Sequence, residues 1–563
     1  MSQQPPNGQS GTTLRDIFQR AVALHQQGQL AEAEQLYQQV LQAQPSSFSV
    51  LYMLGLIAFQ SGVPQRGVEL TSRAIAINPS VAEAHNNLAN GLLQLGRFDD
   101  ALASFDKAIA LKPDYLEAYS NRGALLNQVG RAEEALQSTD RAIALKPDYA
   151  EAHCNRGLAL AALRRLAEAL ASYDRAIALR PEFAEAFNDR GVVLDQLDRH
   201  EDALASFDQA IALRPGYADA YTNRGATLID LTRHHEALTS YDKSLALRPQ
   251  HVETHLNRGL LLLQLGEFTE GWTEFEWRKR LPEAPGARAL PRPLWTGAEE
   301  IRGKTIFIHT EQGFGDALHF CRYARLLDAH GAKIIVSARP SLKKLLASLG
   351  PSIHVIADGD LPPEFDYHCP MLSLPLAFRT ALERIPHETP YLTADAALKT
   401  EWNGLLPAKT KPRIGIVWSG NPEQGNDRNR SMTLETFLPI VSDDADWVAL
   451  QIDLRERDQA ALKQDGRITF FGDAIKDFSD TAALLDLMDL VITVDTSVAH
   501  LAGALGKPVW ILLARNADWR YLLGRNDCPW YPTARLFRQR ALGDWRDVIA
   551  SVKTELAAFL KSR

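Results

Sequence analysis

The sequence predicts a repetitive all-α superhelix followed by an α/β unit of two lobes. Three observations support this fold class. Prolines recur every 34 residues through the first half of the chain. From Lys304 onward, short β-branched runs alternate with helical stretches. A lysine- and proline-rich break, "LLPAKTKP" at 405–412, divides the second half in two.

The composition is that of an ordinary globular protein, with 45% hydrophobic and 23% charged residues over 563 positions. This length predicts several domains. The net charge of −8 argues against a nucleic-acid partner. No apolar run approaches the ~20 residues of a membrane-spanning helix, and the N-terminal residues lack the apolar core of a signal peptide. The four cysteines form no CxxC pair, so we expect reduced thiols and no metal site. Together these observations predict a cytoplasmic protein without a transmembrane segment.

The first half is organised by its prolines, which stand at 45, 79, 113, 147, 181, 215 and 249. With the proline as position 32 of each repeat, position 8 is always small, and position 24 is mostly aromatic. A small residue lets two helices cross closely, an aromatic ring fills the remaining gap, and proline stops the second helix. The pattern resembles the tetratricopeptide repeat (TPR) family. That resemblance implies about eight repeats in an all-α superhelix with a concave wall that holds another protein.

Position 6 of successive repeats carries a row of polar side chains that we assign to acceptor binding: Asn87, Asn121, Asn155, Asp189, Asn223 and Asn257. An amide both donates and accepts hydrogen bonds, so such a row can hold an extended peptide backbone. The row resembles the asparagine ladder of the nucleocytoplasmic O-GlcNAc transferases. In the alternative interpretation, these side chains merely bridge adjacent helices.

The second half contains eight predicted strands, at 304–310, 333–338, 353–357, 413–419, 446–452, 468–472, 490–495 and 508–513. Strand–helix alternation predicts parallel, doubly wound sheets, here in two Rossmann-like lobes. Three tryptophans in the stretch 272–303, Trp272, Trp277 and Trp295, indicate that this connecting segment packs against the lobes. Ligands of such folds bind beyond the carboxyl ends of the strands, so the residues after each strand carry the functional information.

Gly313, Gly315 and Asp316 follow the first of these strands. The glycines permit a tight turn and close backbone approach, and the helix that follows favours an anion at its start. Asp316 is our candidate catalytic residue. Its alternative role is that of an ordinary helix cap.

The strand at 413–419 is followed by the polar loop "GNPEQGNDRNRSM", in which two guanidiniums suit a diphosphate. The alternative is an exposed loop with incidental arginines. The strand at 490–495 leads into Asp495, Thr496 and Ser497 and a helix that starts near Val498, with His500 one turn in. Free N–H groups at that helix start would hold phosphate oxygens. The predicted donor-binding residues are Gly313, Gly315, Ser419, Asn421, Arg428, Arg430, Asp495, Thr496, Ser497 and His500.

"MDLVITVDTSVAHLAGALGKPVWILL" (488–513) and "QGFGDALHF" (312–320) resemble the signature segments of the ADP-heptose–lipopolysaccharide heptosyltransferases, glycosyltransferase family nine. The fused array resembles bacterial TPR-linked protein glycosyltransferases, for which flagellin is a suggested acceptor. These resemblances imply a GT-B fold of two Rossmann-like lobes, a nucleotide-sugar donor bound mainly in the C-terminal lobe, and no cofactor or metal. The expected domains are a flexible N-terminus at 1–13, the TPR array at 14–285, a connector at 286–303, and lobes at 304–405 and 412–563.

Carried over residue by residue, Asp316 matches the family's proposed base, while Asp495, Thr496, Ser497 and His500 match its nucleotide-binding turn. Arg430, or else Arg428, stands where the family has a basic phosphate ligand, normally lysine. Ser497 replaces the usual glycine, and "DWRYLLGRNDCPWYP" (518–532) has no heptose-specific pattern, so the identity of the donor sugar is not implied.

The sequence therefore predicts an inverting, metal-independent glycosyltransferase that moves a sugar to a protein Ser/Thr hydroxyl. Two alternatives remain. One is a heptosyltransferase-like enzyme that acts on a lipid-linked saccharide. The other is a non-catalytic TPR scaffold with a degenerate transferase domain.

Overall fold

The computed structural model describes residues 13–281, 290–311, 313–360 and 362–562, and its described residues form two compact units. One unit extends to Thr227 and the other begins at Leu228. Nearly all of the predicted N-terminal segment 1–13, and residues 286–289 of the predicted connector, lie outside the described residues.

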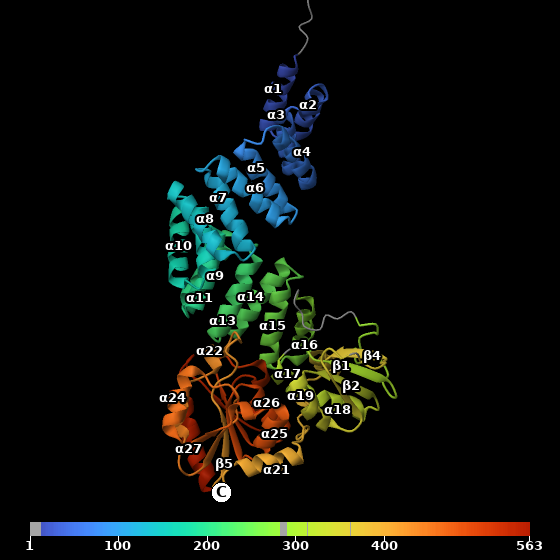
Figure 1. The fold of residues 1–563 in the computed structure, drawn as a ribbon, viewed down its shortest axis with the longest axis vertical. Helices are drawn as coiled ribbons and strands as arrows, with labels where there is room; N and C mark the ends of the chain where they lie inside the picture. Colours follow the sequence, from blue (N-terminus) through green and yellow to red (C-terminus); the bar gives the residue numbers. More distant parts are fainter. Residues whose placement is uncertain (1–12, 282–289, 312, 361, 563) are drawn as a thin grey trace, which may run out of the picture. The chain divides into compact units, whose positions relative to one another are not determined.

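The first unit consists of antiparallel helix pairs, as the 34-residue period predicts (Figure 1). Each pair is one repeat, and a proline follows the second helix of each. The helices that lie in this unit or begin in it are α1 (Leu14–Gln26), α2 (Leu30–Ala43), α3 (Phe48–Gln60), α4 (Pro64–Ile77), α5 (Ala82–Gln94), α6 (Phe98–Leu111), α7 (Leu116–Gln128), α8 (Ala132–Leu145), α9 (Ala150–Ala162), α10 (Leu166–Leu179), α11 (Ala184–Gln196), α12 (His200–Leu213) and α13 (Ala218–Asp230).

The small residue of each repeat packs where the sequence pattern predicts. A Cβ atom added at Gly191 would lie 2.6 Å from the ring of Phe207, and one at Gly157 would lie 2.6 Å from the ring of Tyr173. Both rings are almost wholly buried. The two helices of a repeat therefore cross at a distance that only the smallest side chains permit.

A repeated polar contact joins neighbouring repeats. Arg122 on α7 donates to Asp106 of the preceding repeat (2.7 Å) and to Ser138 on α8 (2.6 Å). Arg156 and Arg190 repeat this arrangement one and two repeats later. Each arginine thus ties three successive helices together.

The second unit begins with the last helices of the array, α14 (His234–Leu247), α15 (Val252–Leu265), α16 (Phe268–Phe275) and the 3₁₀ turn η1 (Glu276–Arg280). Its N-terminal lobe contains β1 (Thr305–His309), α17 (Phe314–Phe320), α18 (Arg322–Ala329), β2 (Lys333–Ala338), α19 (Pro340–Leu346), β3 (Ile353–Ala357), β4 (Tyr367–Pro370), α20 (Leu374–Ala377) and α21 (Ala396–Leu405). The four strands are parallel in the order β3-β2-β1-β4.

The C-terminal lobe contains β5 (Arg413–Val417), α22 (Asp427–Arg430), α23 (Leu434–Phe437), β6 (Asp446–Ala449), α24 (Glu456–Asp465), β7 (Ile468–Phe470), α25 (Phe478–Asp486), β8 (Leu490–Val494), α26 (Ser497–Ala504), β9 (Val509–Leu513), η7 (Trp519–Tyr521), β10 (Asp527–Cys528), β11 (Tyr531–Arg538) and α27 (Arg546–Lys561). The strand order is β10-β11-β9-β8-β5-β6-β7, with only the β10–β11 pair antiparallel among the described strands. The eight predicted strands are confirmed, whereas β4, β10 and β11 were not predicted.

Alternate side chains of the C-terminal sheet enter two different cores. Ile414, Ile416 and Ile492 pack with α27 on one face. Val417, Val491 and Ile511 belong to the other core, which includes α25, α26 and the N-terminal lobe. Figure 1 shows α25 and α26 on one side of the sheet and α24 and α27 on the other.

The end of the repeat array is part of the second core. Phe268 and Trp272 on α16 are buried in it, and so is Trp295 of the connecting segment. Trp272 also donates from its indole N–H to the Thr380 carbonyl, 3.1 Å away. Trp277 instead stacks on His255 of α15, with ring centroids 3.7 Å apart. The prediction that this segment packs against the lobes is confirmed for Trp272 and Trp295.

Candidate functional site

Strand order places a switch point in each lobe. In the N-terminal sheet, β2 and β3 lie on one side of β1 and β4 lies on the other, so the strand order reverses between β1 and β4. A crevice is expected there, at the carboxyl ends of these two strands. In the C-terminal sheet the strand order reverses in the same way between β5 and β8. Asp316 follows β1, the 420–432 loop follows β5, and Asp495 follows β8. The predicted site residues of the two lobes therefore lie at the two positions where such folds bind ligands.

The first turn of α17 lies against the first turn of α26. A Cβ atom on Gly315 would come within 2.9 Å of the His500 ring and 3.9 Å of the Ser497 Cα atom. Gly315 therefore permits the close approach of the two helices. Gly313, the residue that caps α17, has φ −66° and ψ 171°, which any residue can adopt. Glycine is therefore required at position 315 because a larger side chain would clash with α26, and not because the backbone of this turn adopts an unusual angle.

Asp316 lies in the first turn of α17 and forms an ion pair with Arg520 of the C-terminal lobe. Its side chain is 21% exposed. Burial raises the pKa of Asp316 above its ordinary value, whereas the positive charge of Arg520 and the Gly313 N–H oppose that rise. A carboxylate with a raised pKa at a helix mouth is a suitable proton acceptor.

Arg430 is the basic residue that reaches the second switch point. It donates to the Asp495 carbonyl (3.0 Å), and its side chain is only 14% exposed. Its guanidinium also lies against Gly420, where a Cβ atom would be 2.8 Å from Nη2. Arg428, by contrast, is exposed on α22. The structure thus places Arg430 in the site and leaves Arg428 at its surface.

The other loop residues have local partners. Asn421 accepts from the Glu423 N–H at 3.0 Å and so shapes the turn. Ser419 is buried, with the Gln451 amide 3.5 Å away.

In the described part of the chain, the start of α26, directly after β8, has no side-chain cap. Thr496 is its N-cap residue, yet among the described residues its side chain makes no capping hydrogen bond; it contacts Thr493 at 3.2 Å instead. A helix start without a side-chain cap keeps N–H groups that can bind an anion. Asp495 accepts from the Tyr521 hydroxyl at 2.8 Å, and burial raises the pKa of Asp495 to about 6.

His500 is held neutral. Burial lowers the pKa of His500 well below its ordinary value, with the cations Arg520 and Arg322 adding to the effect. Its Nδ1 lies 3.0 Å from the Tyr531 hydroxyl, which also lies 2.7 Å from His319 Nδ1. A neutral ring fixed by one nitrogen can offer the other to a ligand.

The residues after β9 were not among the predicted site residues. In this segment, Arg520 forms ion pairs with Asp316 and with Asp518. Tyr521 donates a hydrogen bond to Asp495. Their segment lies at the carboxyl end of a strand adjacent to β8, so the strand-end rule that found the other loops applies to it too. Arg455, a further missed residue, donates to the Gly420 carbonyl at 2.9 Å.

The predicted acceptor row lies half-buried along the first helices of the repeats. Asn87 donates to Tyr52 (2.6 Å) and Asn223 to Asn188 (3.0 Å), each in the preceding repeat. Asn121 and Asn155 make longer contacts of 3.4 and 3.5 Å, also with the preceding repeat. These side chains bridge helices, as the alternative interpretation has it, and their role in acceptor binding stays a prediction.

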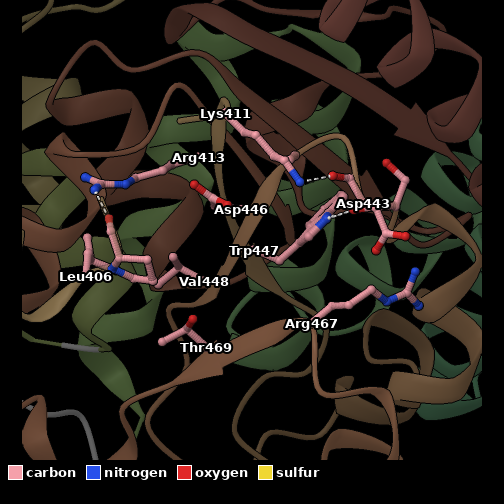
Figure 2. Close-up of a pocket in the computed structure, with 12 residues that line it drawn as sticks. Leu406, Lys411, Arg413, Asp443, Asp446, Trp447, Val448, Arg467 and Thr469 are labelled. Carbon is pink, nitrogen blue, oxygen red and sulfur yellow. Dashed lines mark hydrogen bonds between the residues drawn. The ribbon is translucent and has the colours of Figure 1, made fainter. Parts of the chain in front are cut away.

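A cavity of about 200 Å³ lies at the opposite edge of the C-terminal sheet (Figure 2). Its walls include Arg413, Asp446 and Thr469, at the amino ends of β5, β6 and β7. Lys411 and Arg413 point to backbone carbonyls of the cavity wall. Because parallel α/β sheets bind ligands at their carboxyl ends, this cavity is not the candidate site.

A helical repeat array joined to two parallel α/β lobes, with an acid at one switch point and a basic, anion-ready turn at the other, defines a repeat-linked protein of the GT-B class. Family models for the tetratricopeptide repeat match residues 18–82, 82–115, 154–218 and 222–275, and one for the TPR repeat matches 123–164. The family model for glycosyltransferase family 9 (heptosyltransferase) matches residues 476–516. The chain therefore contains tetratricopeptide repeats, followed by a segment similar to glycosyltransferase family 9. The matched segment includes Asp495 to His500 but neither Asp316 nor Arg430.

Two curated proteins are similar to parts of the chain. Protein FlbA of Caulobacter vibrioides is 27% identical over 319 residues, which cover 52% of this chain and 53% of FlbA. The UDP-N-acetylglucosamine–peptide N-acetylglucosaminyltransferase of Caenorhabditis elegans is 32% identical over 89 residues, 16% of this chain and 8% of that enzyme. The chain thus spans about half of FlbA and less than a tenth of the second relative.

Two solved structures that align with part of the chain are described as TPR proteins. A tetratricopeptide repeat protein from Parabacteroides merdae aligns over 45% of this chain and all of its own, with 17% identity and a TM-score of 0.39. TTC0263, a TPR protein of Thermus thermophilus, aligns over 32% of this chain and all of its own, with 26% identity and a TM-score of 0.30. Within the described ranges, every helix is too short or too polar to cross a bilayer.

Proposed function

We propose that this protein transfers a sugar from a nucleoside-diphosphate sugar to a hydroxyl group of a protein, with inversion at the anomeric carbon. The observation that carries the proposal is the position of Asp316. Asp316 lies at the switch point of the N-terminal lobe and forms an ion pair with Arg520 of the C-terminal lobe. In that second lobe, Arg430 donates to the carbonyl of Asp495.

In the proposed reaction the diphosphate lies between Arg430 and the start of α26. The acceptor oxygen attacks the anomeric carbon while the bond from that carbon to the diphosphate oxygen breaks. Asp316 takes the hydroxyl proton, and Arg430 with the α26 N–H groups stabilises the charge on the departing diphosphate. Fixed groups aimed at developing charge usually contribute the largest part of catalysis.

The repeat array supports a protein acceptor. An array that holds an extended segment of another protein raises the effective concentration of that segment for a transferase site on the same chain. The similarity to a peptide N-acetylglucosaminyltransferase supports the same acceptor class. The row from Asn87 to Asn257 is the proposed contact surface.

The first test is thermal unfolding of the full chain with UDP, GDP, ADP, CMP and CDP, beside Arg430→Ala. A nucleotide at ~100 times its dissociation constant stabilises the protein that binds it by about 2.7 kcal/mol. One nucleotide should raise the melting temperature of the wild type, and the shift should be lost in Arg430→Ala. No shift with any nucleotide would contradict a transferase site.

The second test identifies the acceptor class. The sugar donor of the matching nucleotide, radiolabelled in the sugar, is incubated with the protein and a cell extract, and label is counted in protein and lipid fractions. Label should enter protein, and changing Asn121, Asn155 and Asn223 together to Ala should reduce it without affecting nucleotide binding. Label in the lipid fraction alone would instead favour a lipid-linked saccharide.

A further inference from the structure

Arg520 is a buried cation between two carboxylates. Its side chain is 8% exposed, and its guanidinium contacts Asp316 of the N-terminal lobe and both oxygens of Asp518, at 2.9 and 3.0 Å. Its Nε atom is buried and has no hydrogen-bond partner in the described part of the chain. The ion pair with Asp316 therefore joins the candidate base to the opposite lobe.

The segment that carries Arg520 is fixed from the side of the repeat array. Gln264 on α15 donates to the Ala517 carbonyl at 3.0 Å, and Asn516 donates to Asp230 at 2.6 Å. Trp519 packs edge-on against Trp272 of α16, with ring centroids 5.1 Å apart. The last helices of the array thus form the surface on which this segment rests.

The same segment is strained at its end. Leu522 has φ +52° and ψ −173°, a left-handed conformation that a leucine rarely adopts. Arg538 donates to the carbonyls of Tyr521 (2.6 Å) and Leu522 (2.9 Å) and so holds this backbone in place. Strain of this kind persists where the surroundings over-determine the conformation, and it clusters at functional sites.

We infer that Arg520 is the positioning residue of Asp316: it holds the carboxylate at the mouth of α17, and the last repeat of the array holds Arg520. The inference rests on the proposed function, because it gives Arg520 a task only if Asp316 accepts a proton. It also makes the end of the array a structural part of the catalytic site.

The charged groups around Asp316 are few. Arg520 and Asp518 face it from η7 and the residue before it. His319 and His500 on the two adjoining helices are neutral, because burial lowers the pKa of each well below its ordinary value. Glu311, which lines a small pocket with Asp316, is paired with Arg278. Arg520 is therefore the cation that opposes the effect of burial on the Asp316 pKa, and its ion pair holds the carboxylate in place.

The test compares Arg520→Gln, Arg520→Lys and the control Arg525→Gln, an arginine five residues on that pairs with Asp527. Arg520→Gln should lower kcat on the order of 10²-fold, the cost of a misplaced catalytic group, with an unchanged nucleotide-induced melting shift. The acid limb of the kcat–pH profile should move to higher pH, because loss of the cation raises the pKa of the Asp316 carboxyl. Arg520→Lys should move the limb back towards the wild type, and Arg525→Gln should match the wild type throughout.

Two results would overturn the inference. Loss of the nucleotide-induced shift in Arg520→Gln would make Arg520 a donor ligand. Equal loss of kcat in the Gln and Lys variants, with an unmoved acid limb, would make its role structural only.

A donor-independent measurement separates this inference from the proposed function. Thermal unfolding is compared for Arg520→Gln, Asp316→Asn and the double variant, since residues that act as a pair give non-additive effects. The double variant should melt no lower than the worse single variant. Additive losses of melting temperature would refute the pairing of Arg520 with Asp316. Non-additive losses in a protein that shows no transferase activity would refute the proposed function and leave the pairing intact.

Discussion

At the scale of single residues, partly buried carboxylates determine most of the expected chemistry. Asp316 and Asp495 end up in different lobes, each at the carboxyl edge of its sheet. Burial raises the pKa of both. A third such group, Asp189, lies in the repeat array, where the other members of its row are asparagines.

Asp316→Asn tests the proposed base. The amide is nearly isosteric with the carboxylate but cannot accept a proton, so we expect kcat to fall by about 10²–10⁴-fold. Nucleotide affinity should stay unchanged, because the proposed diphosphate ligands are in the other lobe. Single-turnover transfer and calorimetric titration of the nucleotide measure the two quantities. Full turnover in this variant would remove Asp316 from the role of base.

Asp189→Asn tests the acid in the asparagine row. Burial raises the pKa of Asp189 to about 6, so the folded state binds its proton more tightly than the unfolded chain, where the pKa is about 3.9. The wild type therefore loses stability as the pH rises from 4 to 6, and the asparagine variant should be more stable at pH 7 by roughly 1–3 kcal/mol. The difference should vanish below about pH 4, where both states are protonated.

Urea unfolding at several pH values measures this difference, with Asp148→Asn, at an exposed carboxylate of the same array, as the control. A gain for Asp189→Asn that is the same at pH 4 and pH 7 would contradict the assignment to ionisation.

At the scale of elements, the close helix crossings and the strand ends follow from short sequence patterns. Position 8 of each repeat is small because position 24 fills the space above it, as Gly191 and Phe207 show. The strands β1, β5 and β8 begin where the β-branched runs begin, and polar residues follow each of them. These are local features, so a linear pattern suffices to find them.

Gly191→Ala tests the helix crossing. The added methyl group would lie 2.6 Å from the Phe207 ring, and overpacking of this kind costs about 1–3 kcal/mol. Gly216→Ala is the matched control, because its Cβ atom would meet nothing within 4 Å. Chemical denaturation followed by circular dichroism should show a loss for Gly191→Ala only; equal behaviour of the two variants would contradict the packing argument.

At the scale of the whole molecule, the end of the repeat array and the two lobes share one hydrophobic core. Phe268 and Trp272 of α16 pack with Trp519 and Trp530 of the C-terminal lobe. The boundary between the repeats and the α/β lobes in the sequence is therefore not a boundary between independent cores.

Trp272→Ala tests this shared core. Removal of a buried tryptophan from a core costs about 3–5 kcal/mol, and here it also withdraws the support of the Arg520 segment. We expect lower unfolding stability together with reduced kcat. Trp277→Ala removes a ring that stacks on His255 and lies under the Arg280 guanidinium, and it should cost less. Equal, small losses in both variants would indicate that the array and the lobes are energetically separate.

Periodicity, β-branched runs and strand-end polarity are local signals, so the repeats, the eight strands and the loops with Asp316, Arg430 and Asp495 could be predicted from the sequence alone. Which of these residues contact one another depends on the tertiary structure. Arg520 lies 204 residues from Asp316 in the chain, and its segment has no heptose-specific pattern. The ion pair exists because two lobes and the last repeat fold around one core, and a contact of that range leaves no trace in local sequence.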